Sequence, residues 1–226
     1  TLVHACGGAA ALAGIIVLGA REGRFGRRGE KKSMQPFAAS SIPLVTLGTF
    51  LLWFGWFGFN GFSQLAMGTF DDVNAISKIA VNTHLAGAAG TVTGAALTRL
   101  IGGKTDIVMM LNGALAGLVA ITAEPLTPGP ITAMVIGSIG AVIMYYGTKL
   151  LENLGLDDVV GAIPVHMFAG IFGTLVVPLT NADTSFGTQF IGVISVCIFS
   201  FALSWITFST LKSTVGLRIS KAAEKL

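Results

Sequence analysis

The sequence predicts an all-α polytopic membrane protein. Hydrophobic residues make up 53% of its 226 residues, charged residues only 11%, and the mean hydropathy is +0.78. A soluble domain of this size would carry roughly a quarter charged residues. The apolar residues fall into seven runs, each near the roughly 20 residues that a helix needs to cross a bilayer. The predicted transmembrane helices cover residues 2–20, 42–61, 75–98, 107–123, 130–150, 160–180 and 187–211.

Polar or glycine- and proline-rich connections separate these runs. They lie at residues 21–32, 71–72, 102–104, 125–130, 152–158 and 181–185. The chain, residues 1–226, is therefore predicted to form a single transmembrane domain that ends in a tail at 212–226. Its 30 glycines suit helices whose backbones approach closely in lipid. Cys6 and Cys197 show no disulfide or metal-binding spacing, and the sequence predicts no metal and no cofactor.

The placement of lysine and arginine orients the predicted helices, because cytoplasmic loops carry an excess of both. With seven spans the connections alternate sides, and 13 of the 14 basic residues then fall on one side. Only Lys78 falls on the other side. The sequence therefore predicts that Thr1 and the loop with Asp71 and Asp72 face outward, and that the C-terminal tail is cytoplasmic.

Two histidines stand in matching contexts. Residues 2–8 align without a gap on residues 164–170, so that Val3-His4 matches Val165-His166. An ionisable side chain in lipid marks by default a pathway for ions or protons, and matched segments indicate paired repeats with a site between them. At 1.5 Å per residue, His166 lies about 12 Å from Asp158 and His4 roughly 25 Å from Arg21, so the rings can meet inside the bundle. The alternative is two unrelated histidines that satisfy helix-packing hydrogen bonds.

The helix at 42–61 ends in a cluster of aromatic residues, which runs from Trp53 to Phe62 and is followed by Ser63. Aromatic rings, tryptophan above all, attract cations through their quadrupole. A serine hydroxyl can accept a hydrogen bond from an ammonium-type donor. Since this end is external in the predicted topology, the stretch indicates an outer cation site. An interfacial aromatic belt is the alternative, because tryptophans commonly form one.

These motifs together resemble the family of ammonium transporters, methylammonium permeases and Rhesus proteins. The segments that carry the resemblance, in the family's order, are residues 2–4, 56–63, 112–122, 157–166 and 214–220. Family members have eleven helices, and the first five and the next five form an inverted repeat. The seven predicted helices resemble the fifth to the eleventh. We therefore expect a complete second repeat, a truncated first repeat, and the C-terminal part of a longer protein.

The resemblance implies a role for individual residues. His4 and His166 match the twin pore histidines, Phe59 matches a gate phenylalanine, and Trp56 and Ser63 fall near the outer ammonium recruitment site. It implies a transporter, not an enzyme, that recruits ammonium, deprotonates it and conducts ammonia through a hydrophobic pore. It also implies a homotrimer in the cell membrane and a cytoplasmic regulatory protein of the PII type. Nothing in the sequence indicates a nucleic-acid partner.

Two other functions are weighed against transport. A membrane ammonium sensor or receptor on the same fold is the main alternative. A haem protein with His4 and His166 as axial ligands is disfavoured, because it explains neither the aromatic stretch nor the tail. His84 has no partner motif and is interpreted as structural. Thr122, at the outer end of its helix, could border the entrance.

Overall fold

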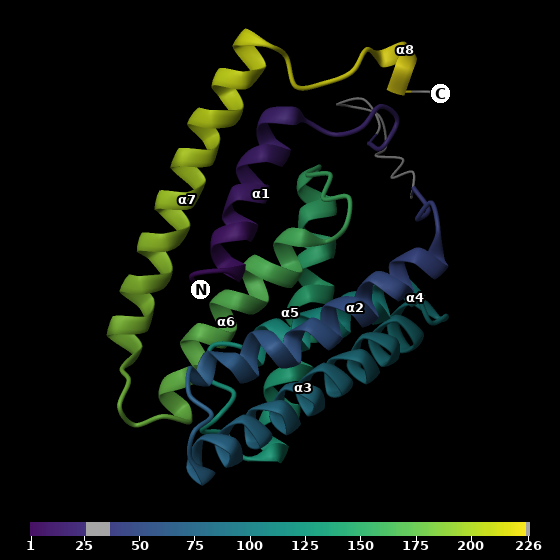
Figure 1. Ribbon diagram of the computed structural model, residues 1–226. Coiled ribbons are helices and arrows are strands. Elements are labelled where there is room, and N and C mark those ends of the chain that lie inside the picture. The colour runs from purple at the N-terminus through teal and green to yellow at the C-terminus, as the bar shows by residue number, and fades with distance from the viewer. Residues whose placement is uncertain (26–36, 225–226) are drawn as a thin grey trace.

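The computed structural model describes residues 1–25 and 37–224, and every regular element in these stretches is helical (Figure 1). The long helices are α1 (His4–Leu18), α2 (Ile42–Gly61), α3 (Phe70–Gly102), α4 (Ile107–Ile121), α5 (Pro130–Leu154) and α7 (Phe186–Thr214). A seventh helical segment is made of η2 (Ile163–Phe168), α6 (Ala169–Val176) and η3 (Val177–Leu179). Two short turns are η1 (Phe62–Gln64) and α8 (Lys221–Glu224). Residues 26–36, which hold most of the basic segment, lie outside the described residues.

These seven helical segments confirm the predicted all-α membrane fold. Three of them are long and apolar enough to cross a membrane: Ile42–Gln64, Pro130–Leu154 and Phe186–Thr214. The segments His4–Leu18, Ile107–Ile121 and Ile163–Leu179 are apolar but shorter. With 33 residues, α3 is about 50 Å long at 1.5 Å per residue. It therefore extends beyond a hydrocarbon core that is about 30 Å thick.

Several helix ends differ from the expected ranges, and local hydrogen bonds explain the differences. The helix expected at 75–98 begins at Phe70, because Thr69 and Asp72 form a capping box. The segment expected from residue 160 begins at Ile163, since the Asp158 carboxylate accepts hydrogen bonds from the backbone N–H groups of residues 161–163. At the C-terminus, α7 continues to Thr214, so the first residues of the expected tail at 212–226 are still helical.

The arrangement of the helices sets the place of the site. In Figure 1, α7 lies beside α1 along one side of the molecule, and α2 and α3 lie on the side away from α7. α1 also packs against η2, which brings the two matched histidine segments together. α7 buries only Val193 and Ser200. Its remaining apolar surface suits contact with lipid or with further helices.

Glycines allow α3, α4 and α5 to pack with their backbones in contact. A Cβ atom on Gly90 of α3 would lie 2.3 Å from the carbonyl oxygen of Gly113 in α4. A Cβ atom on Gly137 of α5 would lie 2.2 Å from the carbonyl oxygen of Ala86 in α3. Helices in lipid associate through close packing of small residues. We infer that the α3–α4–α5 core depends on these glycines.

The substitution Gly90→Ala is expected to destabilise the protein by about 1–3 kcal/mol, the usual cost of overpacking, because the clash is with backbone that cannot rotate away. Thermal unfolding in detergent measures the effect. Gly102→Ala, on the same helix, is the control, since a Cβ atom there has no neighbour within 4 Å. Equal unfolding temperatures for the two variants would refute the inferred role of close packing.

Candidate functional site

The two matched histidines are in direct contact. Nδ1 of His4, in the first turn of α1, lies 3.3 Å from Nδ1 of His166 in η2. The rings are stacked, with centroids 5.4 Å apart and an angle of 15° between their planes. One Nδ1 must carry the hydrogen and the other must accept it. The pair is therefore one hydrogen-bonded unit made by segments 162 residues apart.

His166 lies on an irregular stretch of helix. Residues Ile163–Phe168 form a π-helical turn, which is wider than an α-helical turn and is often found at functional sites. Pro164 stands near the start of this turn, where its missing N–H group costs no hydrogen bond. Asp158 holds the N-terminal end through three backbone N–H groups at 2.7–3.0 Å. The segment is thus anchored at the loop and presents His166 from a widened turn.

Two aromatic rings of α2 enclose His4. The indole of Trp56 is buried and stacks on the His4 ring, with centroids 5.0 Å apart and planes 11° apart. Phe59, one turn further along α2, makes edge-to-face contacts with both rings. Its ring centroid lies 5.8 Å from that of His4 and 6.2 Å from that of Trp56. The structure thus brings together four of the five predicted site residues.

Ser63 lies apart from this group. Its hydroxyl is exposed and donates to the carbonyl oxygen of Phe59 at 2.7 Å. In the part of the chain that the structure describes, no hydrogen bond joins Ser63 to His4, His166 or Trp56. Its position one turn beyond Phe59 places it towards the loop after α2.

Thr122 proves to be a partner of the aromatic group. Its Oγ1 accepts a hydrogen bond of 2.7 Å from Nε1 of Trp56 and donates one of 2.6 Å to the carbonyl oxygen of Leu118. The sequence indicated only that Thr122 could border the entrance. The contact joins residues 66 positions apart, and no local pattern signals it.

A cavity of about 360 Å³ opens beside His4 and Phe59. Its apolar lining includes Val3, Val119 and Val177. Its polar lining is made of Thr1, Thr122, Glu124, Thr174, Thr184 and Gln189. Sequence analysis did not single out Glu124, although it is the one acidic residue in a proline-rich loop. Its carboxylate accepts hydrogen bonds from the backbone of residues 126 and 127 and from Asn181.

The two Nε2 atoms of the histidine pair determine which hydrogen bonds the pair can offer to a bound molecule. His4 Nε2 is buried and has no hydrogen-bond partner among the described residues. In a neutral pair, the ring that donates through Nδ1 leaves Nε2 as an acceptor, and the other ring leaves Nε2–H as a donor.

Two other interpretations of the histidines can be compared with the structure. The direct contact between His4 and His166 leaves no space for a haem iron between the rings, so the alternative of axial haem ligands is wrong. His84 lies elsewhere, against Trp53 at 5.5 Å and Phe57 at 6.2 Å.

The family model described as Ammonium Transporter Family matches residues 1–226. The chain belongs to this family. Ammonium transporter Amt2 of Archaeoglobus fulgidus is 40% identical over 246 residues, which cover 100% of this chain and 51% of the relative. A putative ammonium transporter of Synechocystis is 37% identical, with 100% and 51% coverage. The chain thus spans about half the length of these curated relatives.

Solved structures of the ammonium transporter family show the same fold. A protein described as a sensor Amt protein superposes with a TM-score of 0.91 and 34% identity, over 99% of this chain and 56% of that one. Mep2 of Candida albicans superposes with a TM-score of 0.85 and 27% identity, over 97% and 51%. The predicted family and helical architecture are therefore confirmed.

Proposed function

We propose that this chain supplies the twin-histidine part of an ammonium transporter in the cell membrane. Ammonium is recruited at the outer end of α2, where Ser63 is exposed, and loses its proton there to the external water. Trp56, which the sequence predicted to belong to this outer site, is buried against His4 one turn inside Phe59, so we assign it to the passage beyond the gate. Ammonia then passes Phe59, which acts as the gate, and moves along His4 and His166. The observation that carries the proposal is the 3.3 Å contact between two imidazoles inside an aromatic enclosure.

The energetics favour the neutral molecule in such a passage. Moving a bare monovalent cation into hydrocarbon has an idealised Born cost on the order of 20 kcal/mol. Neutral ammonia buries only hydrogen-bonding groups and costs far less. Deprotonating ammonium costs about 1.4 kcal/mol for each pH unit below its pKa. Potassium has no proton to lose, so an apolar passage selects ammonium by its chemistry and not by its radius.

The histidine pair offers ammonia both kinds of hydrogen-bond partner. One outer Nε2 accepts and the other donates, so ammonia can be bound as donor at one ring and as acceptor at the other. The two rings exchange these roles only if the Nδ1 hydrogen crosses to the second ring while the Nε2 proton of that ring passes through ammonia to the first, so that both rings stay neutral. His4 Nε2, buried and without a partner among the described residues, is the nitrogen that we assign to ammonia beside Trp56.

Flux measurements on the intact protein in liposomes test the proposal. An inward ammonium gradient is expected to raise the luminal pH if ammonia alone enters, or to produce a current if charge enters with it. An equal potassium gradient is expected to produce neither signal. Protein-free liposomes are the control. Potassium flux equal to ammonium flux would overturn the proposed selectivity.

Sensing is the second candidate function, favoured by the structural likeness to a sensor Amt protein. A sensor built on this fold is expected to bind ammonium without sustained net flux. The same liposome experiment separates the two functions, because saturable ammonium binding without flux identifies a sensor. Sustained, ammonium-specific flux identifies a transporter.

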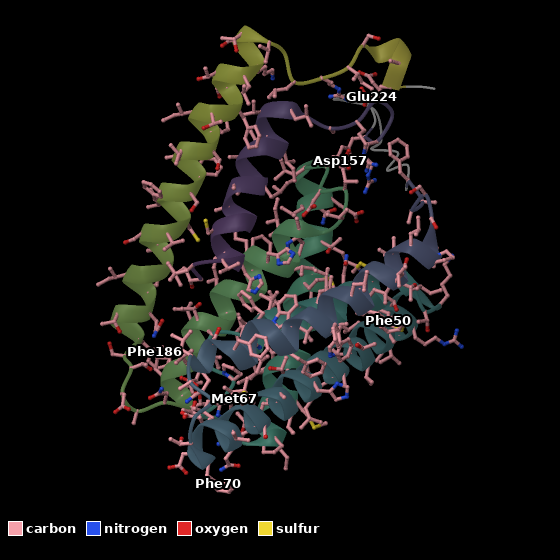
Figure 2. The ribbon with its side chains drawn as sticks, in the orientation of Figure 1. Phe50, Met67, Phe70, Asp157, Phe186 and Glu224 are labelled. Carbon is pink, nitrogen blue, oxygen red and sulfur yellow. The ribbon has the colours of Figure 1, made fainter. Side chains whose placement is uncertain are left out.

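The proposed orientation is supported by the distribution of charge and loops. Figure 2 shows Asp157 and Glu224 at one end of the molecule, and Met67, Phe70 and Phe186 at the opposite end. The first end also holds Arg21, Arg24 and Arg218, and we assign it to the cytoplasm. A homotrimer and a cytoplasmic regulatory protein of the PII type are further proposals that rest on the family.

Loss of the Thr122 hydroxyl is expected to slow transport. Thr122→Val keeps the shape of the side chain but leaves the buried indole N–H of Trp56 without its acceptor, at a cost of about 1–3 kcal/mol. Initial rates of methylammonium uptake by the intact protein are expected to fall several-fold. Thr207→Val is the control, because Thr207 is exposed on α7 and donates only to its own helix. Equal rates for both variants would contradict a positioning role for Thr122.

A further inference from the structure

The matched histidine segments share a second feature, a glycine four residues after each histidine. Gly8 follows His4 and Gly170 follows His166. Residues four apart lie on the same face of a helix, so each glycine lies one turn from a histidine on the face that meets the other segment. Both glycines are buried.

Gly8 allows the backbone of η2 to approach α1. A Cβ atom on Gly8 would lie 2.5 Å from Cβ, 2.6 Å from the backbone nitrogen and 2.9 Å from Cα of Met167. Met167 directly follows His166, so the closest approach of the segments is next to the histidine itself. Since two of the three atoms are backbone, no change of side-chain rotamer could relieve the clash.

Gly170 makes the reciprocal contact with less constraint. A Cβ atom on Gly170 would lie 3.3 Å from the His4 Cβ and 3.3 Å from the Ala5 backbone nitrogen. Such a contact requires the neighbour to move by only a few tenths of an ångström. Gly7 is different, because a Cβ atom there would have no neighbour within 4 Å. Two adjacent glycines, Gly7 and Gly8, therefore differ in the space available for a Cβ atom, which is open at Gly7 and filled by Met167 at Gly8.

We propose that Gly8 is a positioning residue that sets the separation of His4 and His166; its effect on transport rests on the proposed function. With alanine at position 8, α1 and η2 must separate by about 0.9 Å before the added Cβ reaches an ordinary contact of 3.4 Å with Met167. The Nδ1–Nδ1 distance is already 3.3 Å. N–H hydrogen bonds are normally 2.7–3.2 Å long, so this further separation breaks the bond between the rings.

The experiment compares Gly8→Ala with Gly7→Ala in the intact protein. ¹⁵N NMR of labelled histidine reports the hydrogen bond between the rings, and thermal unfolding reports folding. Gly8→Ala is expected to lose the signature of a hydrogen-bonded Nδ1 pair while remaining folded, and Gly7→Ala to retain the wild-type spectrum. Ammonium flux is expected to fall about 10- to 100-fold in Gly8→Ala, because misplacement of reacting groups by 1 Å costs up to this factor.

Each outcome decides a separate point. A wild-type histidine spectrum in folded Gly8→Ala overturns the positioning role, whatever the flux. If Gly8→Ala loses the signature of the hydrogen-bonded Nδ1 pair but the wild-type protein shows no ammonium flux, the positioning role is supported and the proposed transport is overturned. If Gly8→Ala does not fold, Gly170→Ala takes its place and is expected to weaken the paired signature partially. An unchanged spectrum in that variant would overturn the proposal as well.

Discussion

Replacing either histidine of the pair is expected to abolish selective ammonium flux. His4→Ala removes the ring that stacks on Trp56 and leaves Nδ1 of His166 without its partner; His166→Ala does the same to Nδ1 of His4. An unpaired buried polar group costs about 1–3 kcal/mol, and the proposed passage loses one of its two hydrogen-bonding rings. Flux through the intact protein in liposomes is expected to fall to that of protein-free liposomes.

His84→Ala is the matched control for His4→Ala and His166→Ala. The His84 ring is exposed and lies against Trp53 and Phe57, so its removal leaves the His4–His166 pair intact. Ammonium flux is expected to stay close to that of the wild type in this variant. Normal ammonium-specific uptake in both His4→Ala and His166→Ala would remove the pair from the mechanism.

Most of the fold could be predicted from the sequence, because the length of apolar runs and the polarity of the connections decide where helices cross a membrane. The helix expected at 42–61 has these bounds in the structure. The sequence was less informative at helix ends, because single hydrogen bonds determine the first and last residue of a helix. α3 starts five residues early because Thr69 and Asp72 cap it, and α5 continues to Leu154 before Gly155 ends it in a left-handed conformation.

The candidate site could be predicted only in part. Matching contexts identified His4 and His166. The cluster of rings indicated the end of α2 as a site, but only the resemblance to the family singled out Trp56 and Phe59 within it. The contacts between them depend on how α1, α2 and η2 pack, which no local pattern encodes. The bond from Trp56 to Thr122 shows this, since residue type alone does not distinguish Thr122 from the other threonines.

The end of the molecule with Asp157 and Glu224 contains a cluster of charges centred on Asp157, which is only 6% exposed. Its Oδ2 accepts hydrogen bonds from the backbone N–H and Nε of Arg21, at 3.0 and 2.7 Å, and its Oδ1 accepts one from Nη2 at 2.9 Å. Arg24 Nε lies 3.5 Å away. These bonds tie the end of α1 to the loop before η2, so the cluster fixes the two segments that carry His4 and His166.

The charges around Asp157 set its ionisation. Burial alone would raise the pKa of its carboxyl, but the hydrogen bonds and positive charge of Arg21, with Arg24 nearby, hold the pKa below its usual 3.8. A carboxyl with a lowered pKa in the folded protein contributes stability that is present above the unfolded pKa and is lost as the pH falls through the folded value. The cluster is therefore fully stabilising at neutral pH.

The substitution Asp157→Asn is expected to destabilise the protein by about 3 kcal/mol at neutral pH, because it removes the carboxylate of the partly buried Arg21. The largely buried Arg24 loses one of its two carboxylates and keeps Glu152, at 2.7 Å. Thermal unfolding in detergent measures the difference from wild type. This difference is expected to be constant between pH 6 and 8 and to narrow only below pH 3.8, as Asp157 is protonated in the wild type. Asp183→Asn, in an exposed loop, is the control. A difference that disappears already near neutral pH would show that Asp157 is not the charge that joins α1 to the loop before η2.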